Sequence, residues 1–246
     1  MDSTVGRRSF LALVAALLLC ASPVSAQIAF DASGAGGVSS SSWSHTVGAG
    51  SNRLLVVGEF DDTGGSNLLT AVNWNTSESF TKIGQIQTPG DRWVSLWYLL
   101  NPTATTANIT LTTTAGAFEG FSTSYSGVGA LDVSGTGTAA GSPGPVTTTI
   151  TVATNAWIVS ILKEDFGGGI TWTNATSRKD LGTGLHMADS NGPLSGSQTT
   201  QGSLGGGSHN YGMVSASFTV SGGGGGLVCT PTISTLGVGR CGDEAR

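Results

Sequence analysis

Short apolar runs separated by turn-forming residues constrain the fold of this chain more than any other feature of its sequence. After residue 26, runs rich in Val, Ile, Thr, Trp and Phe recur about every ten to thirteen residues, with Gly, Asn, Asp and Pro between them. Strong helical periodicity is absent from the same region. The pattern predicts an all-β chain folded as a two-sheet antiparallel β-sandwich.

Individual strands are placed where an apolar run is bounded by turn residues. We predict strands at 42–47, 53–60, 69–74, 80–87, 92–100, 107–113, 119–126, 146–152, 156–163, 169–173, 178–181 and 211–220. Residues 92–100 are apolar on both faces, which indicates a central strand covered on both sides. The strand at 107–113 is predicted to lie at an edge or at the surface, and 134–149 is predicted to be a loop. The stretch 183–208 is too rich in Gly and Ser for strands to be placed.

The two halves of the predicted domain resemble each other. "NRLLVVGEFDD" at 52–62 is matched by "NAWIVSILKEDF" at 155–166, and glycines follow both. Further on, Val72 and Trp74 match Ile170 and Trp172, each 98 residues apart. We predict an internal duplication whose halves form one jelly-roll or concanavalin-like sandwich around a shared core.

The first 26 residues have the features of an export signal. Arg7 and Arg8 precede a short apolar run, which is followed by the small residues "ASPVSA". This order predicts a signal peptide, residues 1–26, and a periplasmic, extracellular or cell-surface protein. The general secretory route and the twin-arginine route both fit. The rest divides into a sandwich domain, 27–221, and a flexible Gly-rich spacer and tail, 222–246.

Charged residues are sparse, and acids outnumber bases. The chain has a net charge of −5, and removing residues 1–26 changes it to −6. Such a chain would not neutralise phosphates, so no nucleic-acid partner is expected, and no later apolar run predicts a transmembrane segment. After the signal, only Cys229 and Cys241 remain; they are disulfide candidates in an oxidising compartment.

Two of the matched strands end in acidic residues, which are candidate ligand-binding residues: Asp61, Asp62, Glu164 and Asp165. Glu59 and Asp61 share one face of their strand, so two carboxylates converge there. "EFDDTG" supplies the first two acids of the Glu-x-Asp-x-x-Glu strand motif of laminarinase-type glycoside hydrolases but lacks the last, and that chemistry needs both carboxylates. A structural calcium ion is a second interpretation. The favoured interpretation is that the acids are solvated residues at strand ends.

Trp74 and Trp172 are the tryptophans flanked by Asn and Thr, which makes them candidates for stacking on sugar rings at the surface. Symmetric packing in the core is the alternative. The sequence has no nucleophile elbow, phosphate loop or dinucleotide fingerprint. We therefore predict no enzyme, no metal centre and no cofactor beyond the calcium alternative.

The stretches "SSWSHTVGAGSNRLLVVGEF" and "RWVSLWYLL" resemble motifs of a largely uncharacterised bacterial and phage-associated domain of secreted and surface proteins. The resemblance covers about residues 28–220 and implies a jelly-roll or concanavalin-like sandwich with a surface, adhesive or glycan-binding role. It supplies no catalytic residues that could be assigned to this chain. We expect a non-catalytic, adhesion-like module that binds a glycan or a protein partner. The alternatives are a subunit of a surface layer, filament or phage-like particle that self-associates through residues 227–246, and a glycan-active hydrolase.

Overall fold

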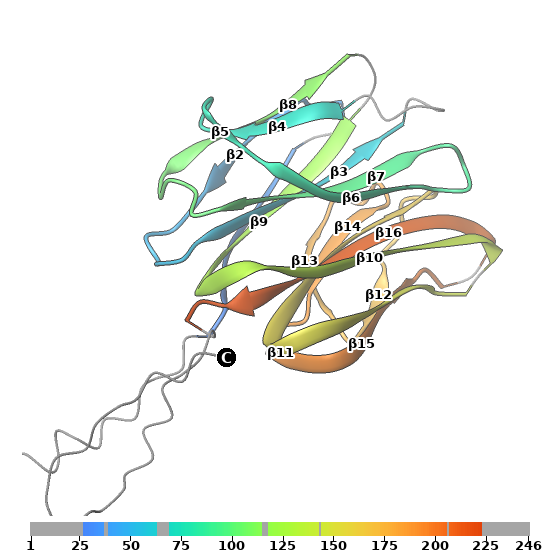
Figure 1. Cartoon of the computed structure of the whole chain (residues 1–246). Coiled ribbons are helices and arrows are strands. Elements are labelled where there is room, and N and C mark those ends of the chain that lie inside the picture. Colours follow the sequence, from blue (N-terminus) through green and yellow to red (C-terminus); the bar gives the residue numbers. More distant parts are fainter. Residues whose placement is uncertain are drawn as a thin grey trace, which may run out of the picture.

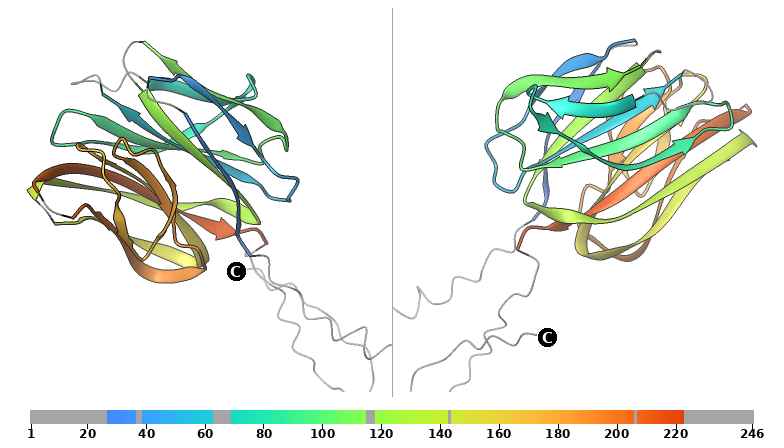
Figure 2. Two further views of the ribbon diagram at one scale, coloured as in Figure 1. Left: turned by 180° about the vertical axis from the view of Figure 1, so that it is seen from behind. Right: turned by 45° about the horizontal axis from the view of Figure 1, so that its top comes forward.

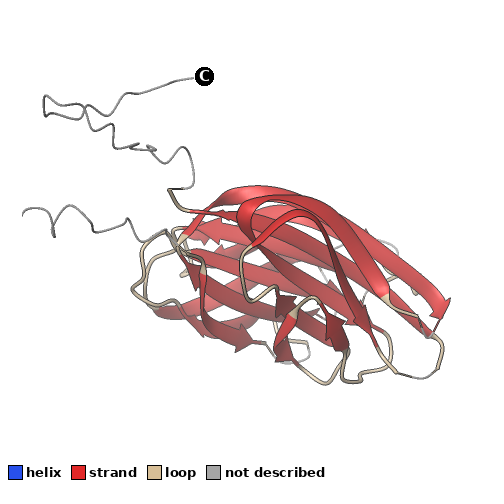
Figure 3. Cartoon of the chain, turned by 90° about the horizontal axis from the view of Figure 1, so that it is seen from below, coloured by secondary structure: helices blue, strands red, loops and turns tan. Residues whose placement is uncertain are grey.

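All regular structure in the described part of the chain is antiparallel β-strand (Figure 3), which confirms the predicted all-β class. The computed structural model describes residues 27–36, 39–62, 69–114, 118–142, 144–205 and 207–222. The predicted signal peptide, the tail and its cysteines lie outside these residues. The strands are β1 (Ala29–Ala35), β2 (Ser42–Thr46), β3 (Leu54–Asp61), β4 (Leu69–Trp74), β5 (Glu78–Ser79), β6 (Thr81–Gln87), β7 (Trp93–Leu100), β8 (Thr106–Thr113), β9 (Phe118–Ser126), β10 (Val128–Ser142), β11 (Val146–Glu164), β12 (Thr171–Thr173), β13 (Thr176–Asp180), β14 (Leu185–Asp189), β15 (Leu194–Ser203) and β16 (His209–Val220).

The two halves of the chain have the same strand order. In the first half, one sheet runs β1-β9-β3-β7-β6 and an outer sheet runs β2-β8-β4-β5. In the second half, the corresponding sheet runs β10-β16-β11-β14-β13, and β12 and β15 join the first part of β11 as the outer layer. Strands therefore wind between two layers in the manner of a jelly roll in each half, and the predicted duplication is confirmed.

The molecule is a stack of layers (Figure 1). The outer sheet of the first half covers its five-stranded sheet, which packs face to face on the five-stranded sheet of the second half; β12 and β15 cover the far side. The two halves remain distinct stacked units when the view is turned (Figure 2). The predicted shared sandwich is thus the middle of the structure, and the outer layers extend it.

Apolar side chains fill each gap between layers. The largest cluster lies between the two five-stranded sheets and includes Val56, Leu96 and Phe218. A second cluster, with Val57 and Trp97, lies under the outer sheet of the first half. Since Leu96 and Trp97 point to opposite faces of β7, this strand is covered on both sides, as its sequence predicts.

The central strands of the two halves are in contact where Gly58 of β3 meets Ile161 of β11. A Cβ atom at Gly58 would overlap the Ile161 side chain, which is fully buried. The residues are equivalent in the duplication, because "NRLLVVGEF" and "NAWIVSILK" start at residues 52 and 155. The absence of a side chain at one of the two equivalent positions lets the halves pack together.

Gly58→Ala is expected to lower the free energy of unfolding by about 1–3 kcal/mol, because the added methyl group overpacks a buried contact. Ile161→Val removes the atom nearest to that methyl group. Urea unfolding of both single variants and the double variant should therefore give a favourable coupling of at least about 0.5 kcal/mol. Strictly additive effects of the two substitutions would contradict this packing.

Two of the local predictions are wrong, and a third holds only in part. The strand at 107–113, β8, lies at the surface, as predicted, because its outer face is exposed. It is not an edge strand, because it pairs with both β2 and β4. Residues 134–142, predicted to be a loop, belong to β10. The stretch 183–208, for which the sequence predicts no strand positions, contains β14 and β15. The sequence match aligns Trp172 with Trp74 at an offset of 98 residues. Strand pairing instead aligns Trp172 with Val72, two residues before Trp74, so the constant offset does not hold.

Both ends of the described chain lie at one end of the stack. The Ser221 N–H donates to the Gly127 carbonyl (2.8 Å), and Gly127 packs against the Gln27 carbonyl. The opposite end carries the connections 88–92, 165–170 and 181–184, which we call the loop pole. Among the residues described, none forms a helix suited to span a membrane.

Candidate functional site

The acids at the end of β3 have different environments. Glu59 and Asp61 are fully buried and face the outer sheet of the first half, whereas Asp62 is exposed and pairs with Arg92 (Oδ1 to Nε, 2.7 Å). The sequence correctly predicts that Glu59 and Asp61 share a face. The solvated-turn interpretation holds for Asp62 and is wrong for Glu59 and Asp61, because the outer sheet covers the strand to its end.

Glu59 is a buried carboxyl group held by a single hydrogen bond. The Ser95 hydroxyl donates to its Oε2 (2.6 Å), and its Oε1 has no hydrogen-bond partner in the described structure. Burial raises the pKa of Glu59 to about 8; Asp61 adds to the rise, while the Ser95 hydrogen bond and Lys82 oppose it. Glu59 is therefore mostly protonated at neutral pH.

The end of β11 is closed by its own carboxylate. Glu164 is fully buried; its Oε2 accepts from the Phe166 N–H (2.6 Å), and its Oε1 accepts from the N–H groups of Gly167 (2.6 Å) and Gly168 (2.9 Å). Burial favours the neutral acid, but His186 and the three N–H groups outweigh it and lower the pKa of Glu164 to about 2. Glu164 is thus a charged residue that shapes the turn after β11, and its predicted solvation is wrong.

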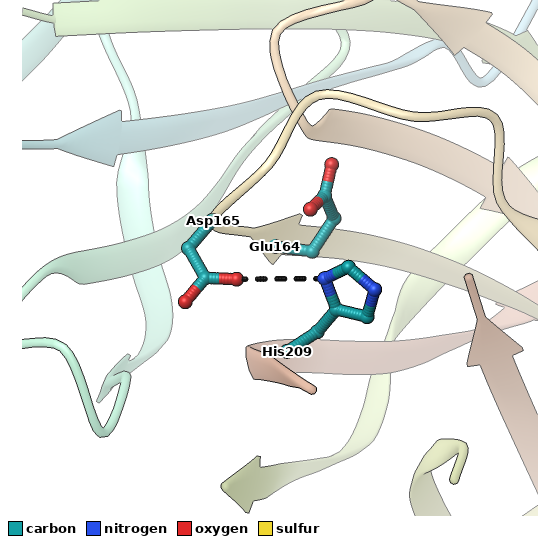
Figure 4. A group of neighbouring side chains, drawn as sticks. All are labelled: Glu164, Asp165 and His209. Atoms are coloured by element: carbon teal, nitrogen blue, oxygen red, sulfur yellow. Dashed lines mark ion pairs between the residues drawn. The ribbon is translucent and has the colours of Figure 1, made fainter. Parts of the chain in front are cut away.

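Asp165 and His209 complete a cluster with Glu164 at the loop pole (Figure 4). The two oxygens of Asp165 accept from the Asn210 N–H (3.1 Å) and Nδ2 (2.9 Å), and its Oδ1 lies 3.9 Å from His209 Nδ1. One donor atom from each of Glu164, Asp165 and His209 lies within 4.8 Å of the others. We call these three residues the acid–histidine cluster; β11 and β16 bring them together because they are neighbours in the sheet.

An exposed aromatic ring borders this cluster. Phe166 is the only large hydrophobic side chain that is exposed in the described structure, at 70%. Its ring meets the His209 ring edge to face at 5.0 Å between centroids, and His209 in turn contacts Tyr211 at 6.0 Å. The ring therefore packs on His209, whose Nδ1 lies near the Asp165 carboxylate.

The two acidic strand ends lie at the same pole and are separated by contacts of Lys163 and Thr183 with the first half. Between them, Lys163 donates from Nζ to the Thr183 carbonyl (2.5 Å) and lies 4.3 Å from the centre of the Phe60 ring. The Thr183 hydroxyl donates to Glu119 of the first half (2.7 Å). Burial lowers the pKa of Lys163, and Glu119 and Glu164 are the acids that most oppose this. These contacts join the two halves.

The tryptophan candidates face inward. Trp74 is fully buried and donates from Nε1 to the Thr103 carbonyl (3.3 Å), so of the two interpretations core packing holds and surface exposure does not. Trp172 is half-buried against the core between β11, β16 and the outer layer. Polar neighbours such as Asn73 misled the prediction, because side chains alternate between the faces of a strand and only the neighbours point outward.

Sequence reasoning missed a pair of equivalent hydrogen-bond networks. Asp31 Oδ2 accepts from the Ser124 hydroxyl (2.7 Å) and the Gly48 N–H (2.8 Å). In the second half, Asp132 Oδ2 accepts in the same way from the Ser217 hydroxyl (2.9 Å) and the Ala153 N–H (2.7 Å). The signal was present as "AFDASG" at 29–34 and "ALDVSG" at 130–135.

The first network also includes a histidine. His45 Nε2 lies 3.0 Å from the Ser124 hydroxyl and Nδ1 lies 2.9 Å from that of Ser122. Burial lowers the pKa of His45 to about 4, although the charge of Asp31 acts to raise it. The ring is therefore neutral at pH 7. The second half keeps the aspartate–serine pair with Ile150 in place of the histidine. The shared pair therefore serves the fold of both halves.

The chain matches no protein-family model, no curated protein and no solved structure. Its class is defined by the fold: an antiparallel all-β protein built from two jelly-roll halves that pack face to face.

Proposed function

We propose that the chain is an exported, non-catalytic module that binds a glycan at its loop pole through Asp165, Phe166 and Asn210. The observation that carries the proposal is the Phe166 ring, which is exposed at 70% yet held by its contact with His209. Sugars present C–H faces that pack on aromatic rings and hydroxyl groups that hydrogen-bond to carboxylates and amides. Asp165, the chain neighbour of Phe166, and Asn210, which hydrogen-bonds to Asp165, supply such groups.

The placement of the chain ends supports this proposal. Gln27 and Ser221 lie together at the end opposite the loop pole, with Gly127 between them. The predicted signal peptide and the Gly-rich spacer both attach on that side. A module tethered there would direct Phe166 away from its attachment point, toward a ligand on another surface.

The electrostatic character of the chain favours a neutral ligand. The net charge is −5, and only 10% of residues are charged. The solvent-facing sides of the outer layers carry neutral polar residues, among them the hydroxyl pairs Thr46–Thr106 (2.8 Å) and Thr149–Thr199 (2.9 Å).

Phe166→Leu is expected to weaken glycan binding about tenfold, corresponding to about 1.4 kcal/mol, because it keeps an apolar side chain but removes the ring face. Phe166→Trp should retain binding. Both are scored by pull-down on cell-wall polysaccharide and on a glycan array. Because Phe166 is exposed, neither change should alter thermal unfolding. Equal binding by wild type and Phe166→Leu, or no binding by wild type, would overturn the proposal.

A further inference from the structure

The acid–histidine cluster combines donor atoms that transition metals accept. It offers one imidazole nitrogen, from His209, and two carboxylates, from Glu164 and Asp165, with one donor atom of each within 4.8 Å of the others. Imidazole with carboxylate is a donor set for Zn²⁺ and related first-row ions, whereas calcium sites use oxygen alone. We infer that this cluster binds one divalent transition-metal ion, for which Zn²⁺ is the probe.

Each of the three donors is fixed in orientation by neighbouring groups. Three backbone N–H groups hold Glu164, and the backbone and side chain of Asn210 hold Asp165. The His209 ring is packed between Phe166 and Tyr211. Contacts of this kind orient metal ligands and are part of what gives a metal site its affinity.

The carboxylates keep capacity for a metal ion despite these hydrogen bonds. An ionised carboxylate offers about four lone-pair sites. Glu164 uses three of them, two on Oε1 and one on Oε2, and Asp165 uses one on each oxygen. Glu164 Oε2 and both oxygens of Asp165 can therefore each accept one more partner.

A second, independent observation comes from β14. His186 is buried, with 1% of its surface exposed, and its Nε2 has no hydrogen-bond partner in the described structure. This nitrogen faces Glu164 Oε1 at 3.9 Å, while Nδ1 lies 3.3 Å from Asp180. A buried imidazole directed at a ligating carboxylate is the arrangement that tunes metal ligands from outside the first coordination sphere.

The spacing leaves room for an ion. Asp165 Oδ1 and His209 Nδ1 are 3.9 Å apart, too far to hydrogen-bond to each other. Metal bonds of about 2.0–2.2 Å at a tetrahedral angle place two ligand atoms roughly 3.4 Å apart, so a small inward movement closes the site. The side chain of Asp165 is 21% exposed and provides the route from solvent. Three protein ligands leave one position for water or another oxygen ligand.

The inference rests on the same loop as the proposed glycan site and would make the metal ion part of it. The test uses Zn²⁺ alone, without any glycan, so either idea can fail while the other stands. Because thiolates also bind zinc, the reference protein is the full chain with Cys20, Cys229 and Cys241 replaced by serine. Isothermal titration calorimetry measures stoichiometry and affinity, and Co²⁺ absorption reports the ligand geometry.

We expect one Zn²⁺ per chain, with affinity at least about tenfold weaker in His209→Gln and in Asp165→Asn. Asp62→Asn is the matched control, since Asp62 ends the equivalent strand and pairs with Arg92, and it should bind as the reference does. Far-ultraviolet circular dichroism establishes that each variant is folded, and Glu164→Gln is a further ligand variant. No zinc binding by the reference, tighter binding of Ca²⁺ than Zn²⁺, or undiminished affinity in folded ligand variants would overturn the inference.

Discussion

Glu59→Gln is expected to change the free energy of unfolding more favourably at alkaline pH than at pH 4.5. The difference between the two changes is roughly 3–5 kcal/mol. Burial raises the pKa of Glu59 to about 8 in the folded chain, against 4.5 when exposed. Between these values, the unfolded state releases a proton that the folded state retains, so stability falls as pH rises. Above about pH 8 the loss is complete, and below 4.5 both states are protonated.

Glutamine at position 59 removes this titration and keeps an acceptor for the Ser95 hydroxyl. Urea unfolding of wild type and variant at pH 4.5, 6.5 and 9 gives the difference directly. Asp62→Asn, at an exposed carboxylate of the same strand end, is the control and should show almost no such trend. The difference in the free energy of unfolding between wild type and Glu59→Gln could instead be the same at pH 4.5 and pH 9. That result would mean that Glu59 ionises as readily in the folded protein as in the unfolded chain.

His45→Ile is expected to protect the protein against acid. Burial lowers the pKa of His45 from 6.5 to about 4, so the unfolded chain takes up a proton that the folded chain resists. The stability contributed by the neutral ring is complete above pH 6.5, and roughly 3 kcal/mol of it is lost as pH falls to 4. The variant should lack this loss, because isoleucine does not titrate.

The substitution copies the second half, where Ile150 stands beside an intact aspartate–serine pair. The variant loses the contacts of His45 with Ser122 and Ser124, so its stability at pH 7 is lower and the slope with pH is the informative quantity. Thermal unfolding between pH 4 and 7 measures it. Parallel profiles for wild type and His45→Ile would show that the histidine is not neutral in the folded state.

The apolar strands of the fold could be predicted from the sequence, and the polar strands could not. Residues 54–57 and 157–162 are buried on both faces, so nearly every side chain there is apolar and the strand is recognisable. β10 and β15 are rich in Gly, Ser and Thr, and their positions depend on partners elsewhere in the chain. Gly137, for example, packs directly against the backbone of Thr147 in β11.

The residues of the candidate site also divide into those that the sequence identifies and those that it does not. The sequence identifies Glu164 and Asp165 because they stand at the end of a recognisable strand. It does not identify His209, which lies 44 residues after Asp165. Their proximity follows from the pairing of Glu164 with Tyr211 between β11 and β16. Burial of Glu59 and Asp61 likewise depends on the outer sheet, whose position no local pattern specifies.

The pairing of β11 with β16 also sets how the protein would respond to mechanical force. Phe166 lies two residues after Glu164, the last residue of β11, and the chain leaves the domain just after β16, at the opposite pole. These antiparallel strands are in register from Trp157 opposite Phe218 to Glu164 opposite Tyr211. A pull between a ligand at Phe166 and an anchor beyond Gly222 would load their hydrogen bonds along the strands, in shear. In this shear geometry the hydrogen bonds between the two strands would bear the load together and would not break one after another.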